Sequence, residues 1–412
     1  MALAEQRAGS FWRLVISAGA ILLINMGARS SLGLFVGPLD AAKGFGLASI
    51  GFSFGVSQFV WGAAQPVFAV LAERWGTRTV LIIGALMVAL GTALTPLAHS
   101  SAALTLTLGV LAAMGAAGGS FAILIGGIAR HLPEHRRAFA GGLINSGASL
   151  GQFLFAPLVQ WLITTLGWAQ AFYVLAATAL LGIPLAMGLT TQLVETPALA
   201  SNPGLGLRAQ VALALADRSY RLVHLAFFTC GFHVAFLATH LPGQVALCGL
   251  SAAVSANALA LIGLFNIAGS LSAGALCQRY RMKMVLAWLY AARAVIIVVF
   301  LLAPKTTLVF YGFAAALGLT YLATVPPTAG LVGKLFGPRH LATLFGLTLV
   351  SHQTGAFFGA WLGGIAVVRY GDYRWMWYAD IALALLAVAC HWPIREARVP
   401  RSLVLRVTTP ER

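Results

Sequence analysis

The sequence predicts an all-α membrane protein with twelve transmembrane helices, and its composition and apolar patterning support that prediction. Of its 412 residues, 60% are hydrophobic and only 9% are charged, whereas soluble domains carry roughly 25% charged residues. The apolar residues gather in runs of about 20, the length that a helix needs to cross a bilayer. This composition leaves too little polar surface to cover soluble domains.

Twelve apolar runs, separated by short clusters of Lys and Arg, are long enough to be spanning helices. The first, 13–37, follows Arg7 and Arg13 as a signal peptide would, but the equivalent runs after it indicate a retained helix. The next five are 46–71, 79–97, 102–129, 138–163 and 168–189. The last six are 222–241, 251–276, 284–302, 306–333, 342–368 and 375–394.

The distribution of basic residues predicts the orientation, because cytoplasmic loops retain positive charge. All but six of the 26 Lys and Arg residues lie in the N-terminus, the even-numbered loops or the C-terminal tail. The exceptions are Lys43, Lys305, Arg369 and Arg374 in odd-numbered loops, and Arg29 and Arg293 within helices. We therefore expect both termini in the cytoplasm of a multi-pass membrane protein. The net charge of +16 is then explained by basic residues retained on the cytoplasmic side, and it does not indicate a nucleic-acid surface.

The two halves of the chain are similar at a shift of 204 residues. The matched pairs are Gly27 and Gly231, Pro38 and Pro242, Gly126 and Gly330, Arg130 and Lys334, Gly142 and Gly346, Gly151 and Gly355, and Gly167 and Gly371. A shift across six helices predicts two parallel six-helix bundles related by an axis along the membrane normal. We assign residues 1–190 to the first bundle, 191–220 to a cytoplasmic linker, 221–396 to the second bundle and 397–412 to a tail.

The loop after the second predicted helix carries a recognisable motif. Its Glu73-Arg74-Trp75-Gly76-Thr77-Arg78 resembles the G-x-L-x-D-R-x-G-R signature of the major facilitator superfamily, with Glu in place of Asp. A degenerate second copy runs from Gly274 to Lys283, with Gln278 and Arg281 in place of Asp and Gly. The resemblance implies a cytoplasmic gate of Glu73, Arg74, Gly76, Arg78, Arg279 and Lys283. The alternative is that these residues are plain positive-inside anchors.

Further segments narrow the resemblance. The stretches 137–142 and 147–152 are similar to the fourth loop and fifth helix of that superfamily. Thr239-His240-Leu241-Pro242, 325–328 and 351–355 resemble the bacterial monocarboxylate-transporter-like and oxalate–formate antiporter branch. Members of that branch often carry an Asp and an Arg in the eighth helix, where Asn266 and Ser270 stand here. The usual anion-binding arginine of the branch is therefore missing.

Arg29 is the best candidate for an anion site. It lies about 15 residues into the first helix, or roughly 22 Å from the cytoplasmic end, where a charged side chain usually faces a cavity. The resemblance implies that helices one, four, seven and ten line the cavity. A structural Arg capped by carbonyl groups is the alternative. At the 204-residue shift Arg29 matches His233, so the two side chains could flank one site, unless His233 is a packed polar residue.

Other polar residues deep in the predicted helices are candidate site residues. The substrate-binding candidates besides Arg29 and His233 are Asn266, His352, Gln353, Tyr321, Asn145 and Gln152, and those for proton coupling are His352 and His233. Asn145 and Gln152 could equally bond between helices. Arg293 lies mid-helix in the ninth span, which is usually peripheral in this fold, so we expect it to be structural. The four Cys residues lie far apart and are interpreted as free thiols.

The cavity chemistry favours an anionic substrate. The ten acidic residues lie in termini, loops or helix ends except Asp380, which is part-way into the twelfth helix. We therefore expect a monomeric, proton-coupled secondary transporter of a small organic anion such as a monocarboxylate, working by alternating access without metal or cofactor. The alternatives are an exporter of neutral or amphipathic compounds and a non-transporting membrane sensor. The sequence carries no HExxH motif and no paired carboxylates within the predicted helices, so it does not indicate an enzyme.

Overall fold

The computed structural model describes residues 2–129, 134–189, 206–337 and 341–397, which form helices joined by short turns. The first half contains α1 (Ala2–Ser30), η1 (Leu32–Phe35), α2 (Val36–Lys43), α3 (Leu47–Trp75), α4 (Thr77–Leu94), η2 (Thr95–Leu97), α5 (Ser101–Leu104), the π-helical η3 (Thr105–Ala112), α6 (Ala113–Gly118), α7 (Phe121–Ala129), α8 (Glu134–Leu166), α9 (Trp168–Leu180) and α10 (Gly182–Met187).

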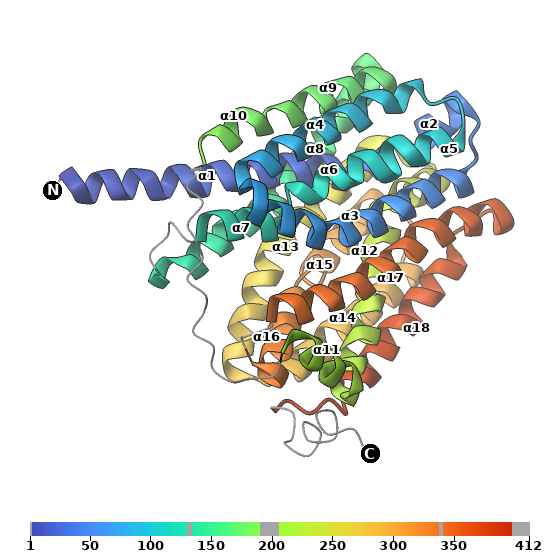
Figure 1. The fold of residues 1–412 in the computed structure, drawn as a ribbon. Coiled ribbons are helices and arrows are strands. Elements are labelled where there is room, and N and C mark those ends of the chain that lie inside the picture. Colours follow the sequence, from blue (N-terminus) through green and yellow to red (C-terminus); the bar gives the residue numbers. More distant parts are fainter. Residues whose placement is uncertain (1, 130–133, 190–205, 338–340, 398–412) are drawn as a thin grey trace, which may run out of the picture.

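The second half contains α12 (Arg218–Leu247), α13 (Ala252–Arg279), α14 (Met282–Leu302), α15 (Thr307–Gly318), α16 (Val325–Phe336), α17 (Leu341–Tyr370) and α18 (Arg374–His391). In Figure 1 the elements of the first half lie together above those of the second half. Between the halves, residues 191–205 of the predicted linker lie outside the described residues. The next part of the linker forms the helix α11 (Leu207–Ala216).

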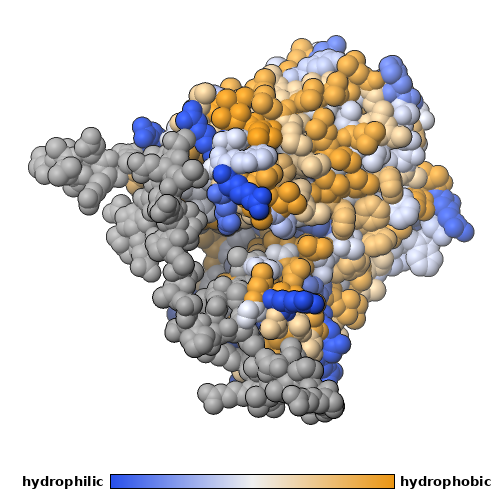
Figure 2. Space-filling model, in the orientation of Figure 1, coloured by the Kyte–Doolittle hydropathy of each residue, from blue (hydrophilic) through white to orange (hydrophobic). Residues whose placement is uncertain are grey.

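The predicted spans all fall on helices. Among the described residues, nine helical segments are long and apolar enough to cross a membrane. The other three predicted spans are the α15–α16 pair, α17 and α18. Helix α17 has 30 residues, but the polar Ser351, His352 and Gln353 lie in its middle. Apolar side chains dominate the visible face along the helices (Figure 2), as expected for a surface in contact with lipid.

Two of the predicted helices are interrupted at equivalent positions of the repeat. The run 102–129 breaks at residues 119–120, between α6 and α7, and the run 306–333 breaks at residues 319–324, between α15 and α16. Helices α7 and α16 begin at Phe121 and Val325, which are 204 residues apart. The repeat therefore includes the interruptions, which the hydropathy of the sequence does not reveal.

Matched glycines have matched roles in the two halves. A side chain at Gly151 of α8 would overlap the carbonyl of Leu23 in α1, and one at Gly355 of α17 would overlap the carbonyl of Phe228 in α12. Such close approach of backbones requires small residues. Gly167 and Gly371 both have positive φ, +90° and +74°, which glycine adopts without strain. The structure thus confirms two parallel, pseudo-symmetric bundles.

The halves pack tightly at one end of the molecule only. The largest cluster of buried apolar side chains includes Phe35 and Phe54 of the first half with Ile262 and Trp377 of the second. At the other end each half has its own cluster, and Figure 2 shows a hollow between the halves. Glycines make the contact at the packed end possible, because side chains at Gly33, Gly51 or Gly364 would overlap backbone of the opposite half. We call this contact the inter-half seal.

Candidate functional site

Arg29 lies at the end of α1, where the helix gives way to η1. Ser30 and Ser31 donate hydroxyl hydrogen bonds back to the carbonyls of Met26 and Gly27, at 2.6 and 2.9 Å, which competes with regular helix continuation. The Arg29 side chain is part-buried and reaches α3 of the same half. The local sequence thus ends the helix next to the candidate arginine.

The Arg29 guanidinium is held by neutral groups of α3. Its Nη1 donates to Ser57 Oγ at 3.2 Å, and its Nη2 donates to the Ser57 carbonyl at 3.4 Å and to the Gln58 side-chain oxygen. Its Cζ lies 4.7 Å from the centre of the Trp61 ring, within range of a cation–π interaction. These three α3 residues carry no sequence signal of their own, and only the contact with Arg29 identifies them.

Arg29 lines a small cavity between the halves. Leu32 and Phe54 of the first half and Thr239 of α12 also line it, and its volume is about 20 Å³. That volume is enough for about one water molecule. Gly33 lies on the same wall, against the carbonyl of Ala238 in the opposite half. The cavity therefore lies beside the inter-half seal.

The charge of Arg29 has no acidic counterpart in the described part of the chain. The four ion pairs there join His233 with Asp380, Lys334 with Glu396, Arg374 with Asp372, and Arg395 with Asp217. A desolvated cation held only by neutral acceptors is electrostatically unbalanced. Arg29 is therefore suited to bind an anion.

His233, the predicted counterpart of Arg29, lies in different surroundings. Its Nδ1 is hydrogen-bonded to Asp380 Oδ2 at 2.5 Å, and both side chains are almost fully buried. His233 does not belong to the wall of the Arg29 cavity. The structure thus does not bring the two pseudo-equivalent side chains together in this conformation, and their role as one site stays a prediction.

His352 and Gln353 lie buried in the middle of α17. Gln353 Nε2 and His352 Nδ1 are 3.3 Å apart, and the His352 ring lies 4.8 Å from that of Phe227. Among the described residues, His352 Nε2 and Gln353 Oε1 have no hydrogen-bond partner. A Cβ at Gly62 of α3 would overlap the Gln353 side chain. Gln353 therefore lies at the contact between the halves.

Two predicted amides connect the halves directly. Gln152 Nε2 donates to the Leu259 carbonyl at 3.1 Å. Asn266 Nδ2 donates to Ser149 Oγ at 2.8 Å, and Asn266 Oδ1 accepts from the backbone N–H of Leu322 at 2.9 Å. Asn145 is one turn before Ser149 on the same face of α8 but is exposed. The structure thus places Asn266 and Gln152 as links between helices of opposite halves.

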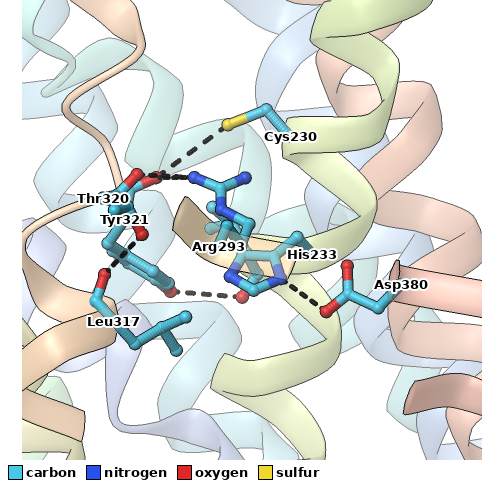
Figure 3. A network of polar contacts seen from close by, with 8 residues as sticks. Cys230, His233, Arg293, Leu317, Thr320, Tyr321 and Asp380 are labelled. Atoms are coloured by element: carbon cyan, nitrogen blue, oxygen red, sulfur yellow. Dashed lines mark hydrogen bonds and ion pairs between the residues drawn. The ribbon is translucent and has the colours of Figure 1, made fainter. Parts of the chain in front are cut away.

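Arg293, His233 and Asp380 lie near the predicted site residue Tyr321 (Figure 3). The sequence did not indicate that these residues come together. Arg293 Nη2 donates to the carbonyls of Thr320 and Tyr321 at 2.5 and 3.0 Å, and Tyr321 Oη donates to the Val234 carbonyl at 3.1 Å. Arg293 contacts the backbone as a structural arginine would. Asp380, on the twelfth predicted helix, is only 1% exposed. Its polar neighbour His233 is 147 residues away in sequence, so spacing could not reveal the pair.

The two copies of the gating motif differ in their contacts. Gly76 has a positive φ of +84° and joins α3 to α4. Glu73 and Arg74 are exposed and Arg78 is half-buried, and none of the three belongs to an ion pair of the described residues. Arg130 lies outside the described residues, and the side chain of Arg137 is not among those described.

The second copy is tied to the end of α18. Lys283 Nζ donates to the carbonyls of Trp392 and Ile394 at 2.9 and 2.8 Å. The Glu396 carboxylate accepts from Lys334 Nζ at 2.6 Å and from the backbone N–H groups of Met282 and Lys283. Arg279 remains exposed. Burial raises the pKa of Glu396, but these hydrogen bonds lower the pKa more, so it lies below the ordinary value of 4.5.

Two parallel six-helix bundles, with a charged side chain at a cavity between them, define a membrane transporter of the six-plus-six type. The sequence matches the Major Facilitator Superfamily over residues 18–350 and, in a second match, over residues 223–408. The chain belongs to that superfamily, and its second half matches again as a repeat should.

Individual proteins of this superfamily are similar along most of the chain. Monocarboxylate transporter 13 of Rattus norvegicus is 26% identical over 88% of this chain and 83% of its own length. The oxalate:formate antiporter of Oxalobacter formigenes is 22% identical over 88% and 86%. The structure of a mutant of the nucleoside transporter NupG covers 92% of this chain and 99% of its own, with a TM-score of 0.76 at 14% identity, which shows the shared fold. The expected superfamily, branch and fold are thus confirmed.

Proposed function

We propose that this transporter moves a small organic anion, a monocarboxylate, by alternating access and that a proton accompanies it. The observation that carries the proposal is the Arg29 guanidinium, which has only neutral partners at the wall of a cavity between the halves. A planar guanidinium binds a carboxylate through two parallel hydrogen bonds. The relatives named for monocarboxylate transport and for oxalate–formate exchange support this choice of substrate class.

Arg29 binds the substrate by exchanging partners. The arriving carboxylate replaces Ser57 and Gln58 as acceptor, and the Trp61 ring keeps the guanidinium in place. The present cavity of about 20 Å³ is too small for an organic anion, so binding requires the halves to move apart at Gly33 and Thr239. The substrate thereby shifts the equilibrium between conformations.

The orientation in the membrane is part of the proposal. We place both termini in the cytoplasm and the monomeric protein in a bacterial inner membrane, because the basic residues gather on that side. The inter-half seal then lies on the periplasmic side, and the hollow between the halves opens to the cytoplasm (Figure 2). Residues 1–190 and 221–396 move as the two units, connected by 191–220.

Replacing Arg29 tests the substrate site. The purified protein is screened by thermal shift against small carboxylates and matched neutral compounds, with Arg29→Gln, Arg29→Lys and, as a control, Arg369→Gln. Arg369 is charged and lies at the far end of α17. We expect carboxylates to stabilise the wild type and Arg369→Gln, Arg29→Gln to lose at least about tenfold in affinity, and Arg29→Lys to retain part of it. Equal binding of carboxylates by wild type and Arg29→Gln, or a preference for neutral compounds, would contradict the assignment.

A further inference from the structure

The second half contains a buried set of ionisable groups outside the Arg29 cavity (Figure 3). His233 of α12, Arg293 of α14 and Asp380 of α18 are 0%, 1% and 1% exposed. Burying one charge in a membrane protein is costly, and such groups are usually paired and functional. Three of them from three helices, meeting away from the proposed substrate site, call for a role of their own.

The three side chains can carry no net charge together, and one nitrogen of His233 is then free to accept a proton. With Arg293 protonated and Asp380 ionised, a neutral His233 gives no net charge and donates its Nδ1 proton to Asp380, 2.5 Å away. His233 Nε2 is then a buried lone pair without a partner among the described residues. A proton on Nε2 produces an imidazolium and keeps the bond to Asp380.

The other titratable groups around His233 have different partners. They are Cys230 on α12, Tyr290 on α14 and Tyr321 in the α15–α16 break, which interact with Arg293, and His352 on α17, which interacts with Cys230. Cys230 Sγ lies 3.2 Å from Thr324 Oγ1, and Tyr290 Oη donates to the Ala226 carbonyl at 3.1 Å. His352 Nε2 also lacks a partner within the described ranges, but no carboxylate pairs with that ring. His233 thus has both the free nitrogen and the counter-ion.

Hydrogen bonds and one peptide link lead from Arg293 to the other half. Arg293 Nη2 binds the carbonyls of Thr320 and Tyr321 in the α15–α16 break. The next residue, Leu322, donates its backbone N–H to Asn266. Asn266 in turn donates to Ser149 of the first half at 2.8 Å. A change at the buried charges therefore has a short path to the contact between the halves.

We propose that His233 and Asp380 form a proton-binding site whose occupancy is communicated through Arg293 and the α15–α16 break to the Asn266–Ser149 contact. The added proton places a second cation beside Arg293, and the repulsion weakens the hold of Arg293 on Thr320 and Tyr321. The break then shifts, and the balance between conformations changes. The use of this site in transport rests on the proposed function, since it would supply the coupled proton.

The first experiment detects the proton without any substrate. Infrared difference spectra of the purified protein between acidic and neutral pH should show imidazole bands that disappear in His233→Gln, with an accompanying carboxylate change that disappears in Asp380→Asn. Asp372→Asn, which removes the exposed partner of Arg374, is the matched control and should retain the bands. Because Asp380→Asn leaves Arg293 unbalanced, the charge-neutral double variant Arg293→Gln with Asp380→Asn is measured beside it. Bands that persist in His233→Gln overturn the proposal.

The second experiment separates proton coupling from substrate binding. In proteoliposomes, His233→Gln should retain exchange of the anion between the two sides but lose pH-driven accumulation by at least about fivefold, a typical coupling between sites. Accumulation at the wild-type level in His233→Gln would overturn the proposal. If wild-type protein shows the imidazole bands but binds no carboxylate, the proton site stands and the proposed substrate fails.

Discussion

The α6–α7 break and the α15–α16 break lie at equivalent positions of the two halves, yet different chemistry holds them. At the first, Asn25 of α1 donates its side-chain amide to the Ala116 carbonyl at 2.8 Å. At the second, Arg293 of α14 donates to two carbonyls and lies near the buried pair of His233 and Asp380 (Figure 3). A neutral amide binds the backbone at the first break, whereas a buried arginine binds it at the second.

The equivalent positions show where the halves diverged. At the 204-residue shift Arg293 corresponds to Ala89, and Asp380 corresponds to Ala176. His233 corresponds to Arg29, the guanidinium without an acidic partner. The charged group at the break therefore does not follow from the shared backbone. The first half presents one unbalanced cation to the cavity, and the second half holds the buried set for which we propose proton binding.

The largest effect on stability is expected from Asp380→Asn. This change removes the carboxylate beside His233 and leaves Arg293 buried and unbalanced, which should lower the free energy of unfolding by about 3–5 kcal/mol. Unfolding in mixed micelles at neutral pH measures it. Asp372→Asn is the control, because its exposed ion pair with Arg374 contributes less than about 1 kcal/mol. Equal losses of unfolding free energy in the two variants would show that Asp380 stabilises the buried charges no more than an exposed ion pair stabilises the surface.

A smaller effect is expected from Asn25→Ala at the other break. The variant loses one neutral hydrogen bond inside the membrane, which averages about 0.6 kcal/mol and reaches about 1.7 kcal/mol. The same unfolding assay measures it, with Asn257→Ala as a control, since Asn257 is exposed and bonded to Tyr311. A loss as large as that of Asp380→Asn would remove the difference between the two breaks.

Most of the fold could be predicted because it depends on periodic and additive properties. Hydropathy locates the spans, and the spacing of glycines such as Gly151 and Gly355 reveals the repeat. The breaks within 102–129 and 306–333 could not be predicted in this way, because a few unpaired backbone groups hardly change mean hydropathy. Val325-Pro326-Pro327 was the available signal, since proline is common at the start of a helix.

The candidate site was harder to predict because it depends on side-chain direction. Arg29 was identified from its depth in an apolar run, and the structure places it at a cavity. Its partners Ser57 and Gln58 are ordinary polar residues in another helix. The sequence placed Asp380 part-way into the twelfth helix, and only the fold shows that its side chain points inward toward His233. Pairs separated by 147 residues follow from packing and not from spacing.

The smallest expected effect on stability concerns the two copies of the gating motif. Glu396 forms hydrogen bonds with residues at the second copy, whereas Glu73 of the first copy is exposed. Hydrogen bonds from Lys334 and two backbone N–H groups keep the pKa of Glu396 below its ordinary value of 4.5. The stabilisation is therefore present above pH 4.5 and is lost as the pH falls through the lowered pKa.

We expect the contribution of Glu396 to be less than about 1 kcal/mol, because Lys334 is half exposed and solvent screens the pair. Thermal unfolding of Glu396→Gln and of the control Glu73→Gln between pH 3 and 7 measures it. Glu396→Gln should melt earlier than wild type at neutral pH and approach it at the acidic end, whereas Glu73→Gln should follow wild type throughout. If the two variants behave alike, Glu396 does not stabilise the second motif copy.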